Sequence, residues 1–134
     1  MMFRRVDHVG VVVKDIGEAR RWLGEIFGLP QRRSLAFPDR QVRAEFYGCG
    51  TVDVEVIELG DPEARRLRLG EGVQARIDHI AVEVEDLHAA LTALAALGVR
   101  TTLPEPRRTN DGLSAWTVAE TTGGISYQLI EKQS

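Results

Sequence analysis

The chain has 134 residues and a formal net charge of −3, with 43% hydrophobic and 28% charged residues. A chain of this length can bury a full hydrophobic core, and its charge excludes the strongly basic balance of a general nucleic-acid-binding protein. No run of about 18 apolar residues is present, so we expect neither a membrane span nor a signal peptide. The single Cys49 cannot form an internal disulfide, which favours a reducing cytoplasm and excludes a cysteine-based zinc site.

One short pattern occurs twice. Residues 7–15 begin with Asp-His, continue as a β-branched alternation and end in an Asp that opens a helical segment, and residues 78–86 repeat this order. The offset is 71 residues both between His8 and His79 (79 − 8) and between Asp15 and Asp86 (86 − 15). A fixed offset with polar residues kept in place indicates an internal repeat.

The first half predicts one strand, one helix and three further strands. Residues 5–13 alternate as a strand, Asp15 is a predicted N-cap, and Gly28 ends the helix. Residues 33–37, 41–47 and 52–58 then form a predicted meander of strands. Residues 59–76 join the two halves and contain a short helix that begins at Pro62.

The second half repeats this plan. We predict a strand at residues 77–84, a helix at 87–97, and strands at 99–103, 113–118 and 125–131, with a loop at 104–112. The predicted fold is therefore α+β, with two βαβββ modules (residues 5–58 and 77–131) that form one curved, cupped mixed sheet with helices on its outer face. Both modules belong to one predicted domain, residues 1–134.

Four polar residues occupy matching positions in the two halves. His8 and His79 lie on the first strand of each half, and Glu55 and Gln128 lie on the last. Their apolar strand neighbours point to the opposite face, so all four would point into one trough if the two sheets join edge to edge. Two imidazoles, a carboxylate and an amide oxygen suit one divalent ion, namely Ni²⁺, Co²⁺, Mn²⁺, Fe²⁺ or Zn²⁺.

This plan resembles the vicinal oxygen chelate superfamily, which includes glyoxalase I (lactoylglutathione lyase) and methylmalonyl-CoA epimerase. The resemblance is strongest to the epimerase-like branch, and its motifs are Asp7-His8-Val9-Gly10, Gly70-Glu71-Gly72, Asp78-His79-Ile80-Ala81, Glu105-Pro106-Arg107 and Thr122-Gly123-Gly124. It implies one divalent ion in the trough that stabilises an enolate. It also implies an isomerase or lyase that moves a proton α to a carbonyl, and we expect a cytoplasmic homodimer acting on a small molecule.

Two residues depart from the epimerase pattern. Epimerases place Gln on the last strand of the first module and Glu on that of the second, whereas Glu55 and Gln128 are exchanged here. The expected third-strand base aligns with Arg43, two residues before Glu45 on the same strand face. We therefore predict Glu55 as both metal ligand and proton-transfer base, with Glu45 as the rival base.

Other interpretations stay open at this point. A non-catalytic binding protein of the bleomycin-resistance type would not need the four polar positions, and a dioxygenase would use two His and one Glu around iron. The arginine pairs at 32–33, 65–66 and 107–108 are either solvated surface or binding residues for an anionic substrate such as a coenzyme A ester. Trp116 either packs in the core or lines the trough, and His88 is expected to be exposed.

Overall fold

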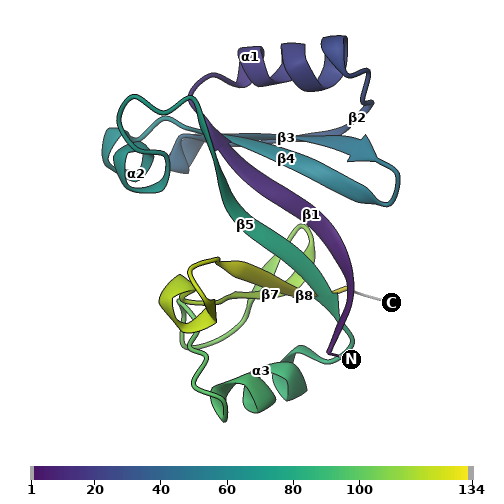
Figure 1. Cartoon of the computed structure of the whole chain (residues 1–134), viewed down its shortest axis with the longest axis vertical. Coiled ribbons are helices and arrows are strands. Elements are labelled where there is room, and N and C mark those ends of the chain that lie inside the picture. The colour runs from purple at the N-terminus through teal and green to yellow at the C-terminus, as the bar shows by residue number, and fades with distance from the viewer. Residues whose placement is uncertain (1, 133–134) are drawn as a thin grey trace. The chain divides into compact units, whose positions relative to one another are not determined.

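The structure is a computed structural model that describes residues 2–132, and these fall into two compact units. We call residues 8–78 the N-terminal unit, and residues 2–7 together with residues 79–132 the C-terminal unit. Figure 1 labels their elements. No helix within the described residues is long and apolar enough to cross a membrane.

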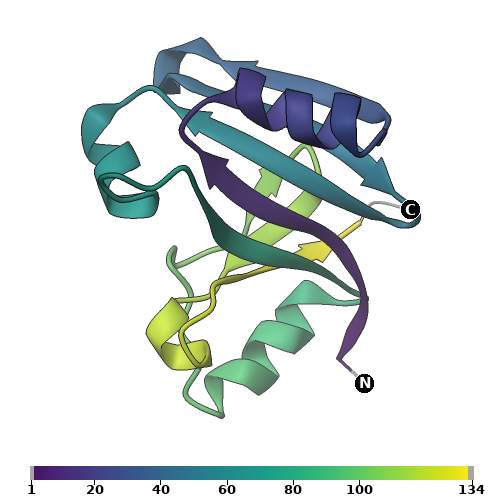
Figure 2. The ribbon, with the colours of Figure 1, turned by 45° about the horizontal axis from the view of Figure 1, so that its top comes forward.

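The N-terminal unit is a four-stranded mixed sheet with a helix on one face (Figure 2). Its strand order is β2-β3-β4-β1, in which β1 and β4 are parallel and β3 is antiparallel to both neighbours. The elements in chain order are β1 (Phe3–Val13), α1 (Ile16–Arg20), η1 (Arg21–Ile26), β2 (Gln31–Phe37), η2 (Pro38–Arg40), β3 (Val42–Cys49), β4 (Val52–Leu59) and α2 (Pro62–Arg68). The first residues of β1 belong to the C-terminal unit.

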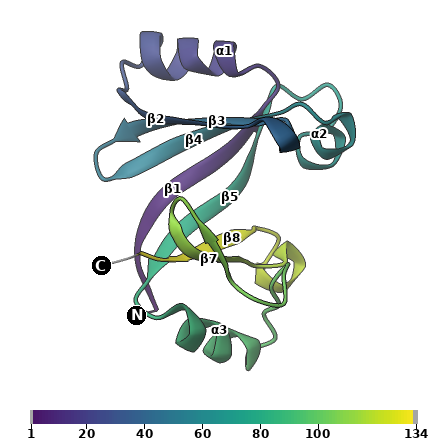
Figure 3. The same ribbon diagram turned by 180° about the vertical axis from the view of Figure 1, so that it is seen from behind.

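The C-terminal unit repeats this arrangement, and Figure 3 shows its strands from behind. Its strand order is β5-β8-β7-β6, in which β5 and β8 are parallel and β7 is antiparallel to β8 and β6. The elements are β5 (Ala75–Val84), α3 (Leu87–Ala95), β6 (Arg107–Thr109), β7 (Gly112–Trp116), η3 (Ala119–Thr122) and β8 (Tyr127–Glu131). The predicted βαβββ order is therefore confirmed in both halves of the chain.

Both main helices begin in the same way. Asp15 accepts hydrogen bonds from the Gly17 and Glu18 backbone nitrogens, and Asp86 accepts one from the Ala89 nitrogen, as N-cap residues do. A carboxylate from the last strand of the same half satisfies another first-turn donor: the Ile16 nitrogen donates to a Glu58 oxygen and the Leu87 nitrogen to a Glu131 oxygen, both at 2.9 Å. The second helix is thus tied to its sheet by the same device as the first.

The predicted strand at residues 99–103 is wrong. Within it, Thr101 makes only an isolated bridge to Thr117, and the second strand of this half is β6, inside the predicted loop. The chain turns from β6 into β7 through Asn110-Asp111, where the Asp111 backbone nitrogen donates to Thr109 Oγ1 at 3.1 Å and Gly112 has φ 136°. This turn chemistry is typical of a hairpin and fixes the strand on its N-terminal side.

Candidate metal centre

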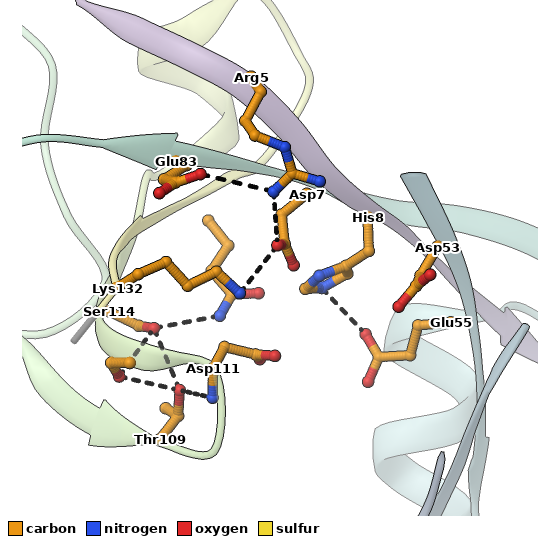
Figure 4. A network of polar contacts seen from close by, with 12 residues as sticks. Arg5, Asp7, His8, Asp53, Glu55, Glu83, Thr109, Asp111, Ser114 and Lys132 are labelled. Atoms are coloured by element: carbon orange, nitrogen blue, oxygen red, sulfur yellow. Dashed lines mark hydrogen bonds and ion pairs between the residues drawn. The ribbon is translucent and has the colours of Figure 1, made fainter. Parts of the chain in front are cut away.

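The N-terminal unit holds one polar pair on the sheet face that points away from α1. His8 is 1% exposed, and its Nε2 lies 3.3 Å from Oε1 of Glu55 (Figure 4). In the parallel register Glu55 is paired with Gly10, two residues after His8, so both side chains share a face. Phe46, paired with Glu55 across β3–β4, meets the His8 ring edge-on with centroids 5.5 Å apart.

The C-terminal unit holds the matching pair. His79 and Gln128 are 6% and 3% exposed. Gln128 is paired with Ala81, which lies two residues after His79. The Gln128 amide nitrogen donates to Ser114 Oγ at 3.2 Å, and Ser114 Oγ lies 3.2 Å from Thr109 Oγ1. This contact commits the amide nitrogen, so the amide oxygen is the atom suited to bind a cation.

Strand register makes the two pairs equivalent. In sequence the histidines are 71 residues apart (79 − 8) but Glu55 and Gln128 are 73 apart (128 − 55), a mismatch of two residues. In the structure each last-strand side chain pairs with the residue two positions after its histidine, which is Gly10 in one unit and Ala81 in the other. The mismatch therefore lies in the segments between the strands, and each unit contains the same two-residue half-site.

The donor chemistry of the half-sites fits a divalent cation. Imidazole suits Zn²⁺, Ni²⁺, Co²⁺ and Fe²⁺, and carboxylate or amide oxygens suit the harder ions of the same series. His8, His79 and Gln128 are buried and Glu55 is partly buried, and all four stand on strands paired in regular register, so these side chains have little freedom to rearrange. His8, Glu55, His79 and Gln128 remain the predicted ligands.

Glu45 lies on the opposite sheet face from Glu55. On β3 it pairs with Val56, whereas Phe46 pairs with Glu55. Glu45 is 5% exposed and accepts two hydrogen bonds from Arg20 of α1, at 3.2 and 2.5 Å, and one from the Tyr47 hydroxyl at 2.7 Å. The expectation that Glu45 faces the trough is therefore wrong: the alternation of β3 turns it toward the helix.

These contacts define the protonation states on the helix face. Burial acts to raise the pKa of Glu45, but the hydrogen bonds from Arg20 and Tyr47 and the charge of Arg20 outweigh it and lower the pKa. Burial and the hydrogen bond to Glu45 raise the pKa of Tyr47 to about 12, so its hydroxyl stays protonated. Arg43 shares this face and lies 3.6 Å from Glu58. Arg43, like Tyr47, therefore does not line the predicted trough.

Asp53 is a site residue that sequence reasoning did not single out. It pairs with His8 across β1–β4 and precedes Glu55 by two residues, so it shares their face (Figure 4). Its Oδ1 lies 3.0 Å from Nε of Arg32, whose Nη2 donates to the Gly50 carbonyl at 2.9 Å. The alternation of side chains along β4 could have predicted this position, because Asp53 lies two residues before Glu55. On β3 the residues of this face, Ala44 and Phe46, carry no acid.

Other residues weighed from the sequence lie away from the half-sites. His88 is exposed in the first turn of α3, as expected, and Cys49 is exposed at the end of β3. Arg66 is an exposed residue of α2, 3.9 Å from Glu63, while Arg65 donates to the Leu59 carbonyl at 3.0 Å. The 65–66 pair therefore belongs to α2 and its contacts.

Comparisons with known proteins identify the fold. A protein of Bacillus subtilis strain 168, "Uncharacterized protein YqjC", is 27% identical over 95% of this chain and 91% of its own length. The mitochondrial methylmalonyl-CoA epimerase of Dictyostelium discoideum is 25% identical over 77% of the chain, which spans 63% of that protein. The crystal structure of methylmalonyl-CoA epimerase from Mycobacterium tuberculosis matches with a TM-score of 0.84 and 22% identity, over 99% of this chain and 91% of that one.

These matches confirm the predicted fold class, since the epimerase structure superimposes over nearly the whole chain. The family model for the Glyoxalase/Bleomycin resistance protein/Dioxygenase superfamily matches residues 7–117, a span that contains both histidines and Glu55. The chain belongs to the Glyoxalase/Bleomycin resistance protein/Dioxygenase superfamily.

Proposed function

We propose that this protein is a divalent-metal-dependent enzyme that moves a proton α to a carbonyl, in the manner of an epimerase, on an acyl-coenzyme A or similar anionic substrate. One observation carries the proposal: a buried histidine with an oxygen-donor partner stands at the same strand register in both units. A lone buried histidine is usually structural, but a second histidine at the equivalent position, with its own oxygen-donor partner, is typical of ligands.

The ligands proposed for the ion are His8 and Glu55 from the N-terminal unit and His79 and Gln128 from the C-terminal unit. A bound divalent cation supplies Lewis acidity, which stabilises negative charge on a carbonyl oxygen. Phe46 positions the His8 ring by its edge contact, and Ser114 orients the Gln128 amide through its hydrogen bond. Both contacts fix ligand orientation before any ion arrives.

Glu55 is the proposed proton-transfer base. It is the one carboxylate among the four ligands, and the β3 positions on its face, Ala44 and Phe46, offer no proton acceptor. Asp53 shares the face, but its carboxylate is engaged in an ion pair with Arg32. We do not propose Glu45 for this role, because it lies on the helix face and is bonded to Arg20.

Acyl-coenzyme A is proposed because of the structural neighbours. A Streptomyces coelicolor methylmalonyl-CoA epimerase with a TM-score of 0.83 was solved in complex with 2-nitronate-propionyl-CoA, and another such epimerase with methylmalonyl-CoA. Methylmalonyl-CoA is therefore the first compound to offer the protein.

Two measurements test the proposal. The first is the metal content per chain after reconstitution with Co²⁺ or Ni²⁺, for the wild type, His8→Ala and His79→Ala. We expect one ion per wild-type chain and at least about 100-fold weaker affinity in each variant, because losing a residue that binds the ion directly costs more than losing one of its hydrogen-bond partners, which costs about 10- to 100-fold. The second is incorporation of solvent deuterium at the α-carbon of methylmalonyl-CoA and related acyl-CoA esters. Equal, negligible metal in all three proteins would refute the proposal. Metal binding without exchange on any acyl-CoA would restrict it to a metal-binding module.

A further inference from the structure

A chain of side chains extends from the N-terminal half-site across three strands. Glu55 on β4 pairs with Phe46 on β3, and Phe46 pairs with Arg33 on β2. The guanidinium carbon of Arg33 lies 3.9 Å from the centroid of the Phe46 ring, which is the distance of a stacked cation–π contact. The same ring touches His8 with its edge. Arg33 is therefore coupled by direct packing to the residues of the half-site.

The C-terminal unit also has an arginine over an aromatic residue that pairs with its half-site. Gln128 on β8 pairs with Trp116 on β7, and Arg107 on β6 pairs with Ser114, which shares the strand face of Trp116. The guanidinium carbon of Arg107 lies 5.4 Å from the Trp116 ring centroid. Each half-site thus has a paired aromatic residue and an arginine that stacks on it.

Stacking prepares a guanidinium for anion binding. An aromatic ring covers one face of the plane and holds it, while the N–H donors lie in the plane and point outward at its edge. Those donors match the two oxygens of a carboxylate or phosphate, and a guanidinium already held in place loses less entropy when it binds. The Phe46 ring is itself held in a core cluster, so it offers Arg33 a fixed surface.

A bulge in β2 places a second arginine on the same sheet face as Arg33. The β2–β3 register shifts between Gln31 and Arg33, so the consecutive Arg32 and Arg33 reach the same sheet face. Arg32 crosses directly over Gly48, where an added Cβ would lie 1.9 Å from its Nε, on the way to Asp53. Only glycine at position 48 leaves room for this path.

We propose that Arg33 on Phe46 and Arg107 on Trp116 bind oxyanion groups of the substrate, one subsite in each unit. This inference rests on the proposed function and deepens it: the substrate class is an organic anion whose carboxylate or phosphate oxygens are held by these arginines while its carbonyl meets the metal ligands. Arg32, which forms an ion pair with Asp53, adds a second positive charge beside the N-terminal subsite.

The test is calorimetric titration of the protein with malonate and, separately, with inorganic phosphate, in both the metal-free and the Co²⁺-loaded forms. Variants are Arg33→Ala, Arg33→Lys and Arg107→Ala. Arg108→Ala is the matched control, because Arg108 adjoins Arg107 but pairs with Leu113 on the opposite face. Thermal melts and Co²⁺ stoichiometry are recorded for every variant.

We expect Arg33→Ala and Arg107→Ala to weaken binding of the preferred anion about 10- to 100-fold, as loss of hydrogen bonds to a charged group does. Arg33→Lys, which keeps the charge without the planar fork, should recover only part of the affinity, and Arg108→Ala should bind as wild type. Preference for malonate would identify a carboxylate subsite, and preference for phosphate a phosphate subsite. Wild-type affinity in both alanine variants, or binding of neither anion by the wild type, overturns the inference. Absent Co²⁺ uptake with intact anion binding would instead count against the metal proposal alone.

Discussion

On one face of each sheet the two units carry the same kinds of side chain, and on the other face they do not. The shared face has a histidine, an oxygen donor, an aromatic ring and an arginine in both units. On the helix face the N-terminal unit has Glu45 bonded to Arg20 and Tyr47. Glu45 pairs with Val56, and at the corresponding place Ala115 pairs with Leu129 inside an apolar cluster.

The comparison separates what the repeat needs from what each unit does locally. The faces with the half-sites carry a histidine, an oxygen donor, an aromatic ring and an arginine in both units, which is what the proposed function requires of them. The helix faces only have to attach a helix to a sheet. The C-terminal unit does this with an apolar cluster, and the N-terminal unit does it with an apolar cluster and the partly exposed Arg20–Glu45 pair. A side chain that differs between the units on the shared face, such as Glu55 against Gln128, is therefore the informative kind of difference.

The largest effect we expect is loss of folding when the halves are separated at residue 70. Residues 2–7 belong to the C-terminal unit, where Phe3 packs near Tyr127 and Asp7 lies 2.8 Å from Lys132 (Figure 4). The N-terminal unit in turn needs Gln74, whose carbonyl accepts from the Lys14 nitrogen. Each fragment would also be close to the size limit for an independent core.

Fragments 1–70 and 71–134, expressed alone, should show no cooperative thermal melt by circular dichroism, and mixing them should restore one. A matched pair cut after residue 78, with residues 1–7 added in trans as a peptide, tests whether the β1 segment is what is missing. A cooperative melt from either fragment as a monomer would show that the units are independent domains.

The next effect concerns the difference between Glu55 and Gln128. Glu55→Gln makes the two half-sites chemically alike, with two histidines and two amides. We expect such a protein to bind Co²⁺ more weakly yet measurably, and to lose α-proton exchange on its acyl-CoA substrate by about 10²- to 10⁴-fold, the usual contribution of a general base. Exchange is followed by mass spectrometry in deuterated buffer on the metal-saturated protein.

Two controls sharpen the result. Glu45→Gln changes a carboxylate on the other face and should leave exchange close to wild type, and Asp53→Asn removes the second acid of the shared face. If metal-saturated Glu55→Gln exchanges at the wild-type rate and Asp53→Asn shows no exchange, Asp53 rather than Glu55 is the base.

Most of this arrangement could be predicted from the sequence, because alternation and capping are local properties. The repeat of Asp-His, the caps at Asp15 and Asp86 and the facing of His8 and Glu55 all follow from periodicity. The stacking of Arg33 on Phe46 could not be predicted, since it depends on a bulge and on cross-strand pairing. Glu45 was placed on the wrong face for a similar reason: the register that pairs Glu45 with Val56 and Phe46 with Glu55 is not a local property of the sequence.

A third prediction concerns a carboxylate introduced on the helix face of the C-terminal unit. Ala115→Glu would place a carboxylate in the apolar cluster of Leu87, Ala90 and Leu129 with no arginine opposite it. An unpaired buried charge costs about 3–5 kcal/mol in comparable cases, so the unfolding midpoint in urea should fall sharply at pH 7. Ala115→Gln separates volume from charge and should be less destabilised. Equal loss in both variants would attribute the effect to overpacking.

The smallest expected effect is the pH dependence of the ion pair on the N-terminal helix face. The pKa of Glu45 is lowered in the folded protein, so its stabilising contribution is complete above the unfolded pKa of about 4.3 and is lost as the pH falls through the lower folded value. Glu45→Gln should therefore cost about 1–2 kcal/mol of unfolding free energy at pH 7, a figure reduced because the Arg20 side chain is 46% exposed.

Urea unfolding from pH 7 down to pH 3 should show the stability curves of the wild type and Glu45→Gln converging at the acid end. Tyr47→Phe keeps the charge pair but removes one hydrogen bond that lowers the pKa of Glu45, so it should keep most but not all of the wild-type pH dependence. Curves for Glu45→Gln and wild type that remain parallel would mean that Glu45 gains nothing from being charged, and the two helix faces would then differ in composition without differing in electrostatics.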